Sequence, residues 1–149
     1  MRADPPSTSP PSETEEQLPR LRIACTALLV VVIGLIVFWP NPVDLGEETG
    51  LTAWLRDFHA AGGPGWITEP LIEFTANIIM FLPVGAVAWW WKTSVVRNTL
   101  FGFGATIFIE VMQAVAVPGR VSDFRDIIAN TLGALIGSGF CALLEHGWK

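Results

Sequence analysis

Amide and carboxylate side chains recur at helical spacing in three apolar segments of the chain. The segments carry Glu69, Glu73 and Asn77, then Glu110 and Gln113, then Asp126 and Asn130. Residues three or four positions apart lie on one face of a helix, so each segment predicts a polar stripe. The connection between the second and third segments adds Arg120, Asp123 and Arg125.

These side chains are compatible with more than one kind of chemistry. A guanidinium holds a phosphate or carboxylate at two points, so Arg120 and Arg125 favour an anionic ligand. Carboxylates such as Glu110 and Asp126 are also the groups that acid–base or metal chemistry would need. The spacing does not select catalysis over binding. A purely structural role, tying the turn between two helices, is an open alternative for each residue.

The position of Glu110 favours a binding pocket over a structural turn. This residue lies roughly 10 Å inside the end of an apolar segment, counted at the helical rise per residue. A charged group at the centre of a membrane helix costs about 2.5–3.5 kcal/mol, so such residues usually have a function. We therefore expect a ligand-binding set in which Arg120 and Arg125 contact an anion and Glu110 and Asp126 orient them. The set is Asn77, Glu110, Gln113, Arg120, Asp123, Arg125, Asp126 and Asn130.

The composition points to lipid as the solvent for much of the chain. Of 149 residues, 51% are apolar and 15% are charged, whereas soluble domains carry about 25% charged residues. A soluble fold of this size could not bury so many apolar side chains. The net charge of −5 leaves no basic surface for nucleic acid. Two cysteines make neither a disulfide framework nor a four-ligand zinc site, and no metal or cofactor is expected.

The apolar segments predict an all-α integral membrane helical bundle with four transmembrane helices and a short interfacial helix. The spans are expected at about residues 21–39, 74–91, 95–117 and 127–144, each close to the length that crosses a bilayer. Between the first two, Leu51, Trp54, Leu55 and Phe58 repeat at helical spacing, but this helix is too short to span and should lie along the interface. Residues 1–20, rich in Pro, Ser and Glu, are expected to be a disordered tail, 21–144 the membrane domain, and 145–149 a short C-terminal tail.

Four spans place the polar stripes at one end of the bundle. The second span enters, the third exits and the fourth begins on the same side of the membrane, and the polar residues lie near those ends. Six of the nine basic residues fall on the opposite side, which the positive-inside rule assigns to the cytoplasm. We therefore expect a multi-pass protein of the cell membrane with both termini cytoplasmic and the polar end outside.

Small residues repeat every four positions in the last span. Ala129, Gly133 and Gly137 form one such row. Rows of this kind allow a second helix to approach closely in membranes. A helix-mediated oligomer through this row is therefore expected.

Two stretches resemble the VanZ-like family of membrane proteins. The segment from Asn77 to Gly85 is similar to that family's N-x-x-x-F-x-P-x-G signature. A second stretch is similar to its E-x-x-Q, G-R-x-x-D-x-x-D and N-x-x-G-x-x-x-G pattern, here Glu110, Gln113, Gly119, Arg120, Asp123, Asp126, Asn130, Gly133 and Gly137. The resemblance covers about residues 73–140. It leaves the tail, the first span and the interfacial helix outside.

The resemblance implies a small helical membrane protein of the cell envelope. The family is named for a protein associated with low-level resistance to the glycopeptide teicoplanin, and no biochemical activity is established for it. It implies that Asn77, Glu110, Gln113, Arg120, Asp123, Asp126 and Asn130 are the functional positions.

Three functions follow as hypotheses. The first is binding of an anionic lipid or cell-wall precursor in the outer polar pocket, which would affect glycopeptide susceptibility. The second is an enzyme acting there on a lipid-linked phosphate with a carboxylate base. The third is an assembly partner that joins another membrane protein through the Gly133 and Gly137 face.

Overall fold

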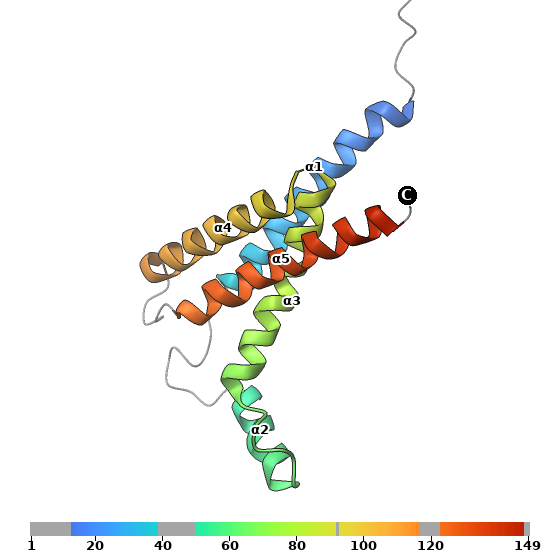
Figure 1. Cartoon of the computed structure of the whole chain (residues 1–149). Helices are drawn as coiled ribbons and strands as arrows, with labels where there is room; N and C mark the ends of the chain where they lie inside the picture. Colours follow the sequence, from blue (N-terminus) through green and yellow to red (C-terminus); the bar gives the residue numbers. More distant parts are fainter. Residues whose placement is uncertain (1–12, 39–49, 92, 117–122, 148–149) are drawn as a thin grey trace, which may run out of the picture.

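The chain forms five α-helices in a computed structural model, which describes residues 13–38, 50–91, 93–116 and 123–147. No strand occurs within these ranges. The helices are α1 (Glu13–Val37), α2 (Gly50–Ala60), α3 (Glu69–Trp90), α4 (Val95–Ala116) and α5 (Phe124–Gly147) (Figure 1). The predicted all-α class is confirmed.

Four of these helices are long and apolar enough to cross a membrane. The spanning stretches are Gln17–Val37, Glu69–Trp90, Val95–Val115 and Phe124–Gly147. The helices α3 and α5 begin several residues before the predicted spans. Pro70 stands in the first turn of α3, where proline costs no hydrogen bond, and Asp123 precedes α5 and bonds to its first turn. The predicted four-span bundle is confirmed.

The first helix begins earlier than the sequence predicted. Its first residue is Glu13, so residues 13–20 continue the helix and do not belong to a disordered tail. The segment Glu13–Leu18 is rich in Glu and Gln, which have high helix propensity. A helix already formed by the apolar residues beyond it extends into such a segment without a new nucleation cost. Residues 1–12 lie outside the described structure.

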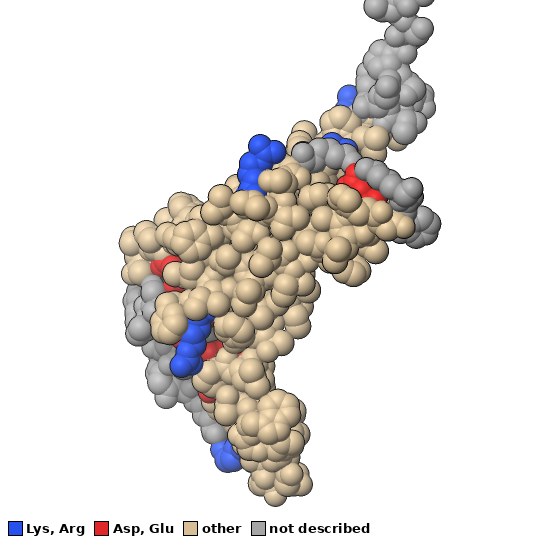
Figure 2. Space-filling model, in the orientation of Figure 1, with Lys and Arg blue, Asp and Glu red and all other residues tan. Residues whose placement is uncertain are grey.

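The apolar side chains of the long helices mostly face outward. In the most apolar stretch of α1 only 6% of the residues are buried, and in that of α5 33% are. Figure 2 shows one face of the molecule, whose middle is almost free of charge while acidic and basic residues gather toward its ends. An uncharged belt of this kind is typical of helices that cross the hydrocarbon core of a membrane.

The short helix α2 packs beside the beginning of α3, beyond the main bundle (Figure 1). Leu55 is buried, while the rings of Trp54 and Phe58 stack with centroids 5.1 Å apart. The chain then turns at Gly62, whose φ of 91° favours glycine. The predicted short helix is therefore confirmed, and its place along the interface stays a prediction.

The helix α5 packs directly against α3 because glycines remove the side chains between them. A Cβ atom on Gly137 would lie 2.0 Å from the carbonyl oxygen of Leu82, and one on Gly133 would lie 2.4 Å from that of Ile78. From the other side, a Cβ on Gly85 would lie 2.1 Å from the carbonyl oxygen of Ala134. The two backbones are therefore in van der Waals contact.

This packing uses the small-residue row within the chain, and the expected oligomer through that row stays a prediction. Ala129, Gly133 and Gly137 are all buried within the chain, and the helix that covers the two glycines is α3. The spacing correctly predicted a close helix approach, but it could not identify the approaching helix.

Two glycines on α5 provide a matched test of this contact. Gly137→Ala should lower the free energy of unfolding by about 1–3 kcal/mol, because the backbones must separate to admit the methyl group. Gly139→Ala meets no atom within 4 Å and should be neutral or stabilising by about 0.5–1 kcal/mol through helix propensity. Denaturation of the purified protein in micelles measures both. Equal effects of the two substitutions would contradict the packing.

Candidate functional site

Buried polar side chains from α3, α4 and α5 meet near the end of the bundle where α5 begins. We call this set the polar cluster, and it consists of Asn77, Thr106, Glu110, Gln113, Asp126 and Asn130. Four members are almost fully buried: Thr106 at 0% exposure, Gln113 and Asn130 at 3%, and Glu110 at 6%. The other two are half-buried. Each of the three predicted polar stripes thus contributes at least one residue to this cluster.

The first connection joins α3 to α5. Asn77 Nδ2 donates a hydrogen bond to Asp126 Oδ1 at 2.7 Å. The acceptor is a carboxylate, which makes this bond stronger than one between neutral groups. The bond lies beside the glycine contact of the same two helices, since Gly133 meets the carbonyl of Ile78, the residue after Asn77.

The second connection joins α5 to α4. Asn130 Nδ2 donates to Thr106 Oγ1 at 2.8 Å. The other amide atom, Oδ1, is buried and has no hydrogen-bond partner among the described residues. A buried acceptor of this kind loses its hydration without compensation, at a cost of about 1–3 kcal/mol.

The third connection joins α4 to α1. Gln113 Nε2 donates to the backbone carbonyl of Val37 at 2.8 Å. Val37 is the last residue of α1. The last carbonyl groups of a helix receive no hydrogen bond from N–H groups of the same helix. The Gln113 side chain therefore satisfies one of these carbonyls and holds the end of the first span against the core.

Glu110 lies between the last two connections on α4. Thr106, Glu110 and Gln113 follow one another at helical spacing, so the three side chains share the face that points into the bundle. Thr106 was absent from the predicted set. Its position four residues before Glu110, on the same face, was the sequence signal that could have found it.

The predicted loop residues behave differently from the helical ones. Asp123 is exposed, and its Oδ1 accepts a hydrogen bond from the backbone N–H of Arg125 at 2.9 Å. This is an N-terminal cap of α5 and accounts for Asp123 without a ligand. The Arg125 side chain is exposed beside the cluster. Arg120 lies outside the described residues.

The cluster can donate, accept and carry negative charge. Within the described ranges no three His, Cys, Asp or Glu side chains gather as a metal ion would require. A cavity of about 560 Å³ runs along the bundle, lined by residues of α1, α3 and α4. Its lining includes no member of the polar cluster, although it reaches Val37, whose carbonyl oxygen accepts the hydrogen bond from Gln113.

Comparison with known proteins gives one family. The model of the VanZ/LLP1 family matches residues 25–145. No curated protein and no solved structure matches the chain. The match confirms the resemblance and extends it, because it includes the second half of α1 and all of α2, which the sequence motifs had left outside.

The bond between α5 and α4 can be tested by a double-mutant cycle of Asn130→Ala and Thr106→Val. We expect a coupling free energy of about 0.6 kcal/mol and at most about 1.7, as for other hydrogen bonds between membrane helices. Unfolding in mixed micelles measures it. Thr75→Val is the control, since the Thr75 hydroxyl bonds only within its own helix, to Leu71 O at 2.8 Å. Its effect should add to that of Asn130→Ala without coupling, and an additive Asn130–Thr106 pair would contradict the contact.

Proposed function

The chain belongs to the VanZ/LLP1 family, and on that basis we propose that it is a cell-envelope protein whose polar cluster binds a lipid with an anionic phosphate headgroup. The ligand is an anionic membrane lipid or a lipid-linked cell-wall precursor, which share a phosphate joined to hydroxyl-bearing groups. Binding would alter the exposure of that lipid and so affect susceptibility to glycopeptides such as teicoplanin.

One observation carries this proposal. Asn130 is 3% exposed, and its Oδ1 has no hydrogen-bond partner within the described part of the chain. The three hydrogen bonds described above for the cluster each join a donor to an acceptor. A hydroxyl from a bound headgroup would supply the donor that this oxygen lacks, and would remove the cost of burying it alone.

The charges near the cluster fit the two parts of such a headgroup. Arg125 is exposed on the first turn of α5, where a guanidinium and a helix N-terminus both favour a phosphate. Glu110 and Asp126 are acceptors suited to hydroxyl groups. Arg120 was predicted to contact the anion as well, and that role stays a prediction.

We further propose that the cluster faces away from the cytoplasm and that both termini are cytoplasmic. Arg22 lies over the ring of Trp90, 5.7 Å from its centroid, so the beginning of α1 and the end of α3 meet. Arg97 stands in the first turns of α4, which follows directly. This grouping of arginines opposite the cluster is the pattern of a cytoplasmic face.

Native mass spectrometry of the full chain tests binding. Asn130→Leu and Thr106→Val each break the bond between these two residues, but only Asn130→Leu removes the unpaired oxygen. We expect Asn130→Leu to bind one lipid fewer than the wild type and Thr106→Val to bind as many as the wild type. Phosphatidylglycerol and a polyprenyl-diphosphate-linked sugar, added separately, distinguish the two sources. Loss from both variants, or from neither, would contradict the proposal, and hydrolysis of either lipid would show an enzyme in its place.

A cellular test uses Arg125, which is exposed on the first turn of α5. We expect expression of the wild-type chain to change teicoplanin susceptibility, and we expect Arg125→Gln to reduce that change because the phosphate loses its charged contact. Arg56→Gln is the control, since Arg56 is exposed on α2, outside the cluster. The minimum inhibitory concentration measures both at equal membrane abundance. An identical response for Arg125→Gln and the wild type would count against a contact between Arg125 and the phosphate.

A further inference from the structure

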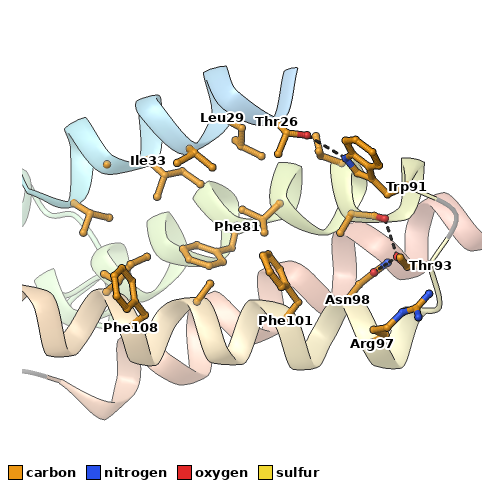
Figure 3. Close-up of a pocket in the computed structure, with 18 of the residues that line it drawn as sticks. Thr26, Leu29, Ile33, Phe81, Trp91, Thr93, Arg97, Asn98, Phe101 and Phe108 are labelled. Atoms are coloured by element: carbon orange, nitrogen blue, oxygen red, sulfur yellow. Dashed lines mark hydrogen bonds between the residues drawn. The ribbon is translucent and has the colours of Figure 1, made fainter. Parts of the chain in front are cut away.

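A cavity lies between α1, α3 and α4. Its volume is about 560 Å³, within the range of about 300–1,000 Å³ that small-molecule sites occupy. Figure 3 shows Phe81, Phe101 and Phe108 along its length, with Leu29 and Ile33 of α1 facing them. Nearly all of its wall is apolar, so its contents must be apolar too.

One end of the cavity is polar. Thr93, Arg97 and Asn98 line it there, beside Trp91 at the end of α3. Asn98 is 2% exposed, and its Nδ2 has no partner among the residues described. Arg97 is exposed in the first turns of α4, where the helix N-terminus adds partial positive charge.

The hydrogen bonds of Thr93 leave one atom of the Asn98 side-chain amide without a partner among the described residues. The Thr93 hydroxyl lies 2.8 Å from Ala88 O and also in contact with Asn98 Oδ1 (Figure 3). Its single hydrogen can be donated to only one of them at a time. In either case a polar atom of the Asn98 amide stays without a partner in the described structure, next to the cavity.

The length of the cavity matches one leaflet of a bilayer. Its lining on α4 runs from Arg97 to Ile109, which is roughly 18 Å along a helix. The hydrocarbon core of a bilayer is about 30 Å thick, so one leaflet is about half of that. The polar end lies near the beginning of α4, at the edge of the membrane, and the apolar part reaches toward the middle.

We propose that this cavity binds one acyl chain of an anionic phospholipid from the leaflet on the Arg97 side. The acyl chain lies along the phenylalanines, and the phosphate lies at the polar end between Arg97 and Asn98. The positive charge of Arg97 and the amide donors of Asn98 complement a phosphate. The polar end of this site, where the phosphate lies, is at the opposite end of the bundle from the polar cluster, and the site does not depend on the function proposed for that cluster.

The experiment compares phosphatidylglycerol with phosphatidylcholine on the purified full chain by native mass spectrometry. For the wild type we expect about tenfold tighter binding of phosphatidylglycerol, the effect of one charge-assisted contact. Arg97→Gln should bring the two lipids to nearly equal affinity, while Arg97→Lys should keep most of the preference. Arg56→Gln, on the exposed face of α2 and outside the cavity lining, should leave it unchanged.

Substitutions at two glycines distinguish binding in the cavity from binding elsewhere on the surface of the protein. Gly34→Leu places a side chain in the cavity, where Gly34 meets no atom within 4 Å, and should abolish binding. Gly104→Leu also enters open space, but outside the cavity lining, and should bind as the wild type does. Unfolding midpoints of both variants verify that the fold survives.

Other results would overturn the inference. These are equal binding of the two lipids by the wild type, an unchanged preference in Arg97→Gln, or wild-type binding by Gly34→Leu. If Arg125→Gln removed the preference in place of Arg97→Gln, the lipid would lie at the polar cluster, which contradicts this site and supports the proposed function. If Gly34→Leu converted a dimer into a monomer, the occupant would be a second copy of the chain.

Discussion

The backbone contact between α3 and α5 is the constraint on which the rest of the structure depends. It exists because Gly85, Gly133 and Gly137 have no Cβ atoms at the points where the helices touch. In lipid the hydrophobic effect does not drive helices together, so close packing and polar bonds must do so. Once the two backbones touch, Asn77 and Asp126 are near enough to bond directly. The buried polar residues are thus a consequence of the glycines as much as of their own chemistry.

The polar cluster then extends this core to the remaining spans. Asn130 ties α5 to Thr106 of α4, and Gln113 ties α4 to the last carbonyl of α1. Each bond satisfies groups that would be costly to leave alone in hydrocarbon. Within the cluster, one amide oxygen of Asn130 has no partner among the described residues. A buried acceptor of this kind is a natural place for a ligand.

Much of the architecture was predictable because it follows from periodicity. The spacing of Glu110 and Gln113, and of Asp126 and Asn130, places each pair on one helical face, and span topology brings those faces to one end. The helix that packs against these glycines was not predictable. Nothing in the sequence tells whether Gly137 meets a helix of the same chain or another, because both satisfy the same small-residue pattern. The cavity was also missed, since it depends on how far α1 stands from α4. The helical start at Glu13 was missed because a polar, acidic segment is compatible with both tail and helix.

The first helix is attached differently from the others. Hydrogen bonds from Gln113 to Val37 O and from Trp91 Nε1 to Thr26 Oγ1 hold it, together with the contact of Arg22 with the Trp90 ring. Most of its surface is exposed. The remaining spans pack without its help. During biosynthesis α1 can therefore wait in the bilayer as an independent helix while the later spans assemble, and dock last. The wall that it contributes to the hydrophobic hollow is then the final part to be completed, after lipid has already surrounded the other two sides.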